Sequence, residues 1–248
     1  MVDMNSRVIL LGGKVRSTPN LGRIFGIRIR LHYTWFVAII LMTAAVVTQF
    51  STAYPLWQRI MLGIAASLLF FVAIIIREFI LSFIATNKGI TVNRITLFVF
   101  GGVHEVAKES TLPTHELLLA VAGMMSNLII AGIFYVAYFG LAHTAHIIID
   151  VLVQWLAFIY FMLALFHFIP GLPLDGGKVL RALLWKATGN YERVTRIASW
   201  TGWSIGLIFT LGGILVLIIT QQWFVGIFLA FPGLVLQNAA THSRRQAG

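Results

Sequence analysis

The sequence contains no cysteine and few acidic residues. Without cysteine, the 248-residue chain can form neither disulfide bonds nor a thiolate metal site. Only 8 residues are Asp or Glu, against 18 that are Lys or Arg, so the formal net charge is +10. Charged residues make up 10% of the chain, whereas hydrophobic residues make up 59% and the mean hydropathy is +0.90. This composition excludes a soluble globular domain and predicts a polytopic membrane protein.

The excess of basic residues predicts how the chain lies in the membrane. In a soluble protein this charge would indicate nucleic-acid binding, but in a membrane protein it indicates basic cytoplasmic loops that face anionic lipid. We therefore expect the lipid bilayer as a partner, and no nucleic acid. With both termini in the cytoplasm and six spans, every basic residue except Arg59 and Arg77 lies on the cytoplasmic side.

The apolar runs divide the chain into three parts. Residues 1–31 form a basic cytoplasmic segment that lacks the apolar core of a cleavable signal peptide. Residues 32–236 form the transmembrane domain, and residues 237–248 form a polar cytoplasmic tail. We expect an all-α fold of about six transmembrane helices with a small β element at 90–103, which is rich in β-branched and aromatic residues. The expected helices are 32–50, 59–85, 116–141, 145–169, 197–220 and a short last one at 223–236.

Two adjacent charges, Arg77 and Glu78, interrupt the apolar run 72–83. Charges inside a membrane helix are costly, so they mark a functional site. Positions 77 and 81 lie one helical turn apart and share a face. With histidine at both positions the helix would read H-E-x-x-H, in which the two histidines bind zinc. Here the positions hold Arg77 and Leu81.

Five short segments occur in a characteristic order along the chain. They are G-R-I-F-G-I-R-I at 22–29, R-E-F-I-L-S at 77–82, I-T-L-F-V-F-G-G-V at 95–103, A-G-M-M-S-N at 122–127 and P-G-L-P-L-D-G-G-K-V-L-R-A at 170–182. Across residues 20–245 this order resembles the site-2 protease family of intramembrane zinc metalloproteases, in its sporulation-factor and CBS-type branch. The resemblance implies a site-2 protease-like core in a bacterial or archaeal cell membrane.

The resemblance also implies roles for individual residues. In that family the two histidines of H-E-x-x-H and the aspartate of L-D-G bind zinc, and the glutamate acts as general base. Glu78 matches the base and Asp175, on a loop that we expect to be re-entrant or interfacial, matches the third ligand. Gly101 and Gly102 border the family's substrate cleft, and Asn127 matches a second position of that cleft.

The departures from the family pattern bear directly on activity. Arg77 and Leu81 replace both histidines, and neither side chain can bind zinc. Asp175 is thus the only retained ligand position, which puts the family's zinc cofactor in question for this chain. The resemblance implies a catalytically inactive pseudoprotease that binds a transmembrane segment of a substrate or partner protein.

Several alternatives follow from the same residues. The chain could be an active intramembrane metalloendopeptidase with an atypical metal site, in which His167 and His104 replace the lost ligands. A transporter or channel has only the intramembrane charges in its favour. For the Arg77 guanidinium we expect a salt bridge with Asp175; the alternatives are snorkelling to the lipid head groups and pairing with Glu78.

Overall fold

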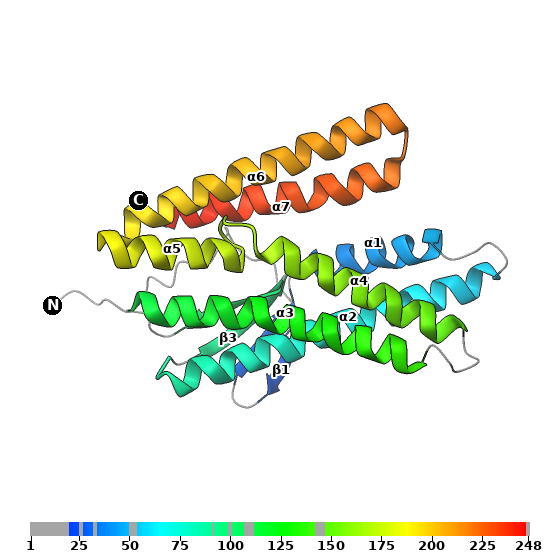
Figure 1. Ribbon diagram of the computed structural model, residues 1–248, viewed down its shortest axis with the longest axis horizontal. Helices are drawn as coiled ribbons and strands as arrows, with labels where there is room; N and C mark the ends of the chain where they lie inside the picture. The colour runs from blue at the N-terminus through cyan, green and yellow to red at the C-terminus, as the bar shows by residue number, and fades with distance from the viewer. Residues whose placement is uncertain are drawn as a thin grey trace.

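The computed structural model describes residues 20–24, 27–31, 34–49, 54–90, 92–98, 101–106, 112–141 and 147–246. Residues 1–19 of the predicted basic segment lie outside the described residues. Helices dominate the described part of the chain (Figure 1). They are α1 (Thr34–Gln49), α2 (Leu56–Asn87), α3 (Pro113–Leu141), α4 (Ile147–His167), α5 (Asp175–Thr188), α6 (Tyr191–Thr220) and α7 (Trp223–Gln246).

Five of these helices, α2, α3, α4, α6 and α7, are long and apolar enough to cross a membrane. The predicted class is therefore confirmed: the chain is an integral membrane protein with a mostly helical fold. The first predicted span, α1, has only 16 residues, or roughly 24 Å at 1.5 Å per residue, which is short for a bilayer core of about 30 Å. The last span, α7, has 24 residues and continues past the predicted end at 236.

The polar end of α7 explains why its length was underestimated. The predicted span ends where Gln237 and Asn238 replace apolar residues. In the structure the Gln237 amide donates a 2.8 Å hydrogen bond to the Thr210 hydroxyl of α6, so this polar turn packs against a neighbouring helix. Hydropathy alone does not detect a helix whose polar groups are paired within the protein.

The predicted β element is present and extends to the N-terminal segment. Its strands are β1 (Asn20–Ile24), β2 (Ile27–Leu31), β3 (Val92–Phe98) and β4 (Gly101–Val106). They form one sheet in the order β1-β2-β3-β4, in which β2 and β3 are parallel and the other two pairs are antiparallel. The parallel pair joins the segment before α1 to the segment after α2, so the sheet connects two distant parts of the chain.

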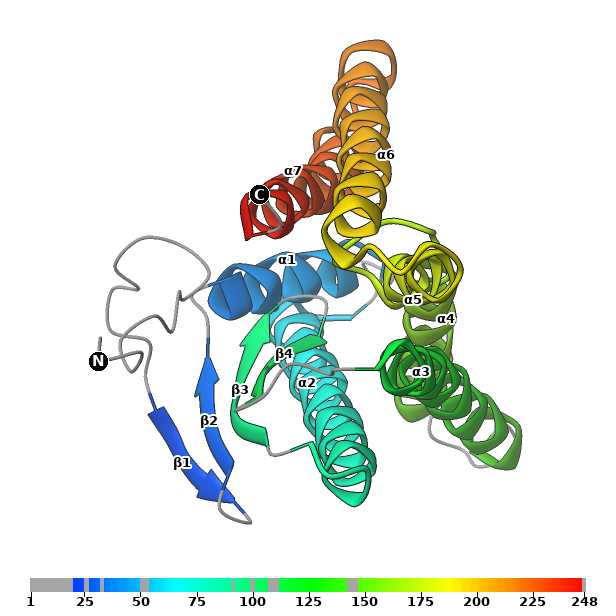
Figure 2. The same cartoon turned by 90° about the vertical axis from the view of Figure 1, so that its left-hand side faces the viewer.

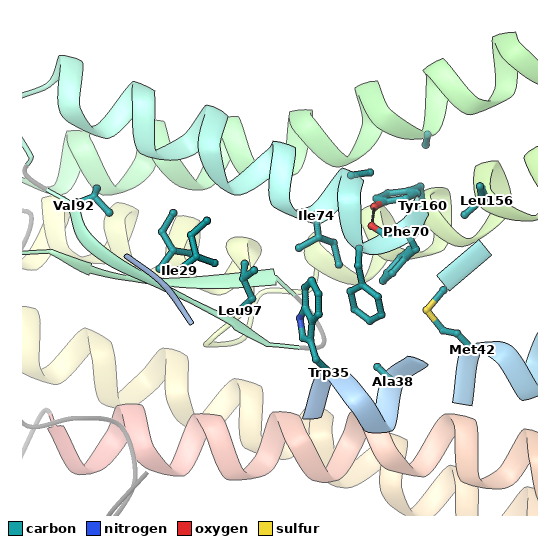
Figure 3. Close-up of a cluster of buried hydrophobic side chains, with 14 of the residues drawn as sticks. Ile29, Trp35, Ala38, Met42, Phe70, Ile74, Val92, Leu97, Leu156 and Tyr160 are labelled. Carbon is teal, nitrogen blue, oxygen red and sulfur yellow. Dashed lines mark hydrogen bonds between the residues drawn. The ribbon is translucent and has the colours of Figure 1, made fainter. Parts of the chain in front are cut away.

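A hydrophobic core joins the sheet to the four helices α1, α2, α3 and α4 (Figure 3). Ile29 and Leu97 contribute from the sheet, and Trp35 of α1 stacks against Phe71 of α2 with ring centroids 4.0 Å apart. Tyr160 of α4 is fully buried, and its hydroxyl donates to the backbone carbonyl of Phe70. This core fixes α2, and with it the charged segment near its C-terminal end.

Two groups of helices are visible when the molecule is viewed from the end (Figure 2). The α6–α7 hairpin stands to one side, and α1 lies between this hairpin and α2. The hairpin is connected to the other helices chiefly through α5. In Figure 1 the C-terminal ends of α2 and α7, the N-terminal end of α6 and the whole of α5 lie toward the same end of the molecule.

Candidate functional site

The Arg77 and Glu78 side chains are buried on α2. Their residues are 4% and 1% exposed, respectively. The alternative in which Arg77 snorkels to the lipid head groups is therefore wrong. Ser82, one turn later, donates a 2.8 Å hydrogen bond to the Glu78 carbonyl, and Leu81 is also buried. The face of α2 that carries these four residues is turned toward the protein interior, whereas Ile80 and Phe83 on its other face are exposed.

The Arg77 guanidinium connects three helices. Nη2 donates to the Asp175 carboxylate of α5, and Nη1 donates to the Glu78 carboxylate of α2. Nε donates to the Gly123 carbonyl of α3 at 3.4 Å. The predicted pairing with Asp175 is present, and so is the pairing with Glu78 that was given as an alternative. Both pairs form because the long arginine side chain places its planar head between the two carboxylates.

Asp175 is the first residue of α5 and is not on a loop. The following Gly176 and Gly177 explain how a helix can start here. A Cβ on Gly176 would lie 2.5 Å from the Ile169 carbonyl oxygen, and one on Gly177 would lie 2.2 Å from the Gly171 carbonyl carbon. The glycine pair therefore lets the start of α5 pack against the backbone of the preceding turn. This packing holds Asp175, which is 3% exposed, against α2 and α3.

The Asp175 carboxylate has a second cationic partner. Lys178, one turn later on α5, donates from Nζ to Oδ1 at 2.9 Å, whereas Arg77 binds Oδ2. Burial alone would raise the pKa of Asp175, but the positive charges around it, that of Lys178 foremost, lower this pKa to about 2. Asp175 is thus ionised, with one cation on each carboxylate oxygen.

Gly123 makes the close approach of α3 possible. A Cβ at this position would lie 2.6 Å from Asp175 Oδ2 and 2.7 Å from Arg77 Nη2. Any larger residue would therefore separate the ion pair from α3. Asn127, the next residue on this face of α3, is fully buried, and neither its amide nitrogen nor its amide oxygen has a hydrogen-bond partner within the described residues.

The other predicted site residues lie around this centre or outside its described contacts. His167 is the last residue of α4 and is 4% exposed, and its Nδ1 lies 2.8 Å from the Leu163 carbonyl oxygen. It is also one of the groups that lower the pKa of Asp175. Gly101 and Gly102 begin β4, opposite Phe98 and Leu97 of β3. The His104 backbone pairs with Ile95 in the same ladder, but its side chain lies outside the described residues.

Sequence reasoning did not assign Gly123 and Lys178 to the site. Both could have been found from spacing alone. Gly123 lies four residues before Asn127, and Lys178 lies three residues after Asp175, so each shares a helical face with a predicted site residue.

The fold and this centre together define a class of protein: a membrane-embedded helical core with a small β-sheet, in which acidic groups from two helices meet inside the protein. The family model for peptidase family M50 matches residues 14–212. The chain therefore belongs to peptidase family M50, the site-2 protease family.

Similarity to individual proteins agrees with this assignment. The chain is 34% identical to "Putative zinc metalloprotease sll0528" of Synechocystis over 94% of its own length and 62% of that protein. It is 29% identical to zinc metalloprotease MJ0392 of Methanocaldococcus jannaschii over 78% of its length and 53% of that protein. The solved structure of the site-2 protease from the same archaeon superposes with a TM-score of 0.64 at 26% identity, over 89% of this chain and 95% of that one. The chain thus spans about three fifths of the curated relatives or less.

The residues present do not fit the zinc ion that this family implies. Zinc needs three protein ligands and an open position. Among the residues that the structure describes, no group of three histidine, cysteine or acidic side chains could hold a metal ion. Glu78 and Asp175 supply carboxylates, but the Arg77 guanidinium lies between them, and Lys178 binds the remaining Asp175 oxygen.

Proposed function

We propose that this chain is a non-hydrolysing member of the site-2 protease family that binds a transmembrane segment of another membrane protein. In this proposal the Arg77 guanidinium replaces the metal ion, and Glu78 and Asp175 keep a structural role in place of base and ligand. Zinc is then absent from the working protein.

The observation that carries this proposal is the position of the Arg77 guanidinium. It donates to both carboxylates of the centre, so it supplies the positive charge that a cation would otherwise supply. Removing one partner from a buried ion pair is costly, typically about 3–5 kcal/mol. The exchange of both histidines for Arg77 and Leu81 therefore leaves the acids paired and needs no metal. Because Arg77 donates to both carboxylates, Glu78 is held in an ion pair in place of the general-base role and Asp175 in place of the ligand role.

Two features support the binding of a partner segment. Strand β4 is the last strand of the sheet, and an edge strand can pair with an extended peptide through its backbone. Gly101 and Gly102 at its start present no side chains that would keep a peptide away.

The finer parts of the proposal concern branch and topology. We assign the chain to the sporulation-factor and CBS-type branch on its motif order, and we place both termini in the cytoplasm. Residues 1–31 then form the cytoplasmic N-terminal segment, residues 32–236 the membrane domain and residues 237–248 the tail. The grouping of basic side chains at one end, on α5, at the start of α6 and at the end of α7, supports this orientation.

Metal analysis of the purified chain tests the absence of zinc, together with a cleavage assay on a transmembrane substrate. We expect less than a tenth of a zinc ion per chain, roughly, and no product. Stoichiometric zinc that is lost in Asp175→Ala would contradict the proposal and would favour the atypical metallopeptidase, with His167 and His104 as the ligands to test next.

A gain-of-binding variant provides the complementary test. Arg77→His combined with Leu81→His restores two imidazoles one helical turn apart, beside the retained Glu78 and Asp175. We expect this double variant to bind one zinc ion, and the same variant carrying Asp175→Ala to bind it weakly. A double variant without zinc would show that the centre has changed beyond the two histidines.

A further inference from the structure

A second distinctive surface lies on α6, away from the site described above. A shallow, largely open hollow lies along the cytoplasmic half of this helix in the proposed topology. Its lining residues all belong to α6: Arg193, Arg196, Ile197, Trp200, Thr201 and Ser204. They follow the three- and four-residue spacing of one helical face. The hollow thus combines two arginines, an indole ring and two hydroxyl groups on one exposed surface.

The hollow is positively charged, and no acidic side chain in the described part of the chain pairs with its arginines. Arg193 and Arg196 are exposed, and neither forms an ion pair with Glu192 or with any other described acidic residue. The Arg244 guanidinium of α7 lies over the Trp200 ring, 4.2 Å from its centroid. This contact adds a third positive charge and fixes the orientation of the indole. Three guanidinium groups that form no salt bridge with the acidic side chains described by the structure favour an anionic ligand.

Beyond the hollow, toward the C-terminal end of α6, the same face of the helix carries apolar side chains. Ile208 is 67% exposed, Leu211 56% and Leu215 57%, and they continue the spacing that begins at Arg193 and Trp200. Because α6 has 30 residues, it is roughly 45 Å long and passes through the full hydrocarbon layer. The surface therefore has a charged part at head-group level, near the start of α6, and an apolar part further along the helix at the level of the acyl chains.

We propose that this surface is a binding site for an anionic phospholipid. The proposed binding of a partner segment does not require such a site. The Arg193 and Arg196 guanidinium groups bind the phosphate, as planar forked donors do with phosphate oxygens. The Trp200 indole lies at the level of the glycerol backbone, where tryptophan is enriched in membrane proteins. One acyl chain lies along Ile208, Leu211 and Leu215. A free phosphate ion would contact only the charged part of the surface and would leave this apolar face without a role.

Lipid retention by the purified full-length chain tests the site. The protein is exchanged into mixed micelles with equal amounts of phosphatidylglycerol and phosphatidylcholine, and bound lipid is counted by native mass spectrometry. We expect one phosphatidylglycerol to be retained in preference to phosphatidylcholine. The double variant Arg193→Gln, Arg196→Gln should lower that occupancy roughly tenfold, because each basic group near an anionic head group contributes separately.

A matched control removes the same charge elsewhere on the cytoplasmic side of the proposed topology. Arg28→Gln with Lys88→Gln alters two exposed basic residues outside the hollow, and its occupancy should stay within about twofold of the wild type. Trp200→Leu keeps an apolar side chain without the indole, and should lower occupancy by about threefold. Equal losses in the control and in the arginine variant would overturn the proposal, as would equal retention of both lipids or displacement of phosphatidylglycerol by millimolar inorganic phosphate.

Discussion

The centre formed by α2, α3 and α5 and the α6–α7 hairpin bring membrane helices together by opposite means. In the centre, Arg77 joins carboxylates from two helices and a carbonyl from a third. In the hairpin, glycine residues let two backbones approach directly: a Cβ on Gly213 would lie 2.5 Å from the Ala230 nitrogen, and one on Gly206 2.8 Å from the Gly233 carbonyl oxygen. The first contact depends on charge balance, and the second depends on the absence of side chains.

The kind of contact determines which substitutions each region can tolerate. Lipid tails are as apolar as leucine, so apolar burial does little to hold two membrane helices together. The centre should therefore tolerate removal of all its charges at once better than removal of one of them. The hairpin should accept any change that adds no atoms to its contact face and resist a single added methyl group.

Removing the Arg77 charge should have the largest effect. Arg77→Leu leaves Glu78 and Asp175 buried without their shared cation, and we expect a loss of about 3–5 kcal/mol in unfolding free energy. Titration with a denaturing detergent, followed by circular dichroism, measures this loss.

The matched control removes the acids together with the arginine. Arg77→Leu combined with Glu78→Gln and Asp175→Asn leaves no unpaired charge, and most of the lost free energy should return. If the triple variant were no more stable than the single one, the charge balance would not be what holds the centre together.

An added methyl group in the hairpin should have the next largest effect. Gly213→Ala places a Cβ against the α7 backbone, so the helices must separate, at a cost of about 1–3 kcal/mol. The adjacent Gly212→Ala provides the control, because its Cβ would meet only the Leu229 side chain at an ordinary 3.8 Å. Thermal unfolding in detergent should show a lowered transition for the first variant alone. Equal transitions for the two variants would show that the contact is not backbone-limited.

How far the sequence predicts these two regions depends on the kind of contact. The pairing of Arg77 with Asp175 was predictable, since a buried charge must find a partner and motif order indicated which one. The simultaneous contact with Glu78 was not, because helical spacing argues against neighbours and does not consider the reach of arginine. The role of Gly123 depends on the angle between α2, α3 and α5, which only the three-dimensional fold determines.

The hairpin and the sheet show the same limit. Glycines recur at seven-residue intervals in both helices, at Gly206 and Gly213 and at Gly226 and Gly233, and this spacing is typical of close helix contact. The sequence does not say which helices meet, so the pairing comes from the short turn between α6 and α7. The pairing of β2 with β3 was not predicted, because it joins residues more than 60 positions apart, such as Arg28 and Arg94.

The smallest expected effect concerns Lys178, whose side chain is 38% exposed. Because solvent screens this salt bridge, Lys178→Met should cost about 0.5–1 kcal/mol near neutral pH. The pKa of Asp175 should also rise, since Lys178 contributes most to lowering it. A carboxyl whose pKa is lower in the folded state stabilises the fold above its ordinary pKa of 3.8, and this contribution is lost as the pH falls toward about 2.

Melting temperatures measured in detergent between pH 6 and pH 2.5 test the pH range over which this contribution of Asp175 is lost. In the wild type, the contribution of Asp175 is lost between its ordinary pKa of 3.8 and its folded-state pKa of about 2. In Lys178→Met the folded-state pKa is higher, so the loss should be smaller and should be complete at a higher pH. Lys186→Met, which removes a charge from the last turn of the same helix where no described acid pairs with it, should leave the acid profile unchanged. If Lys178→Met and the wild type lost stability over the same pH interval, Lys178 would not be needed to keep Asp175 ionised. The salt bridge from Arg77 of α2 to Asp175 of α5 would then be sufficient without the charge of Lys178.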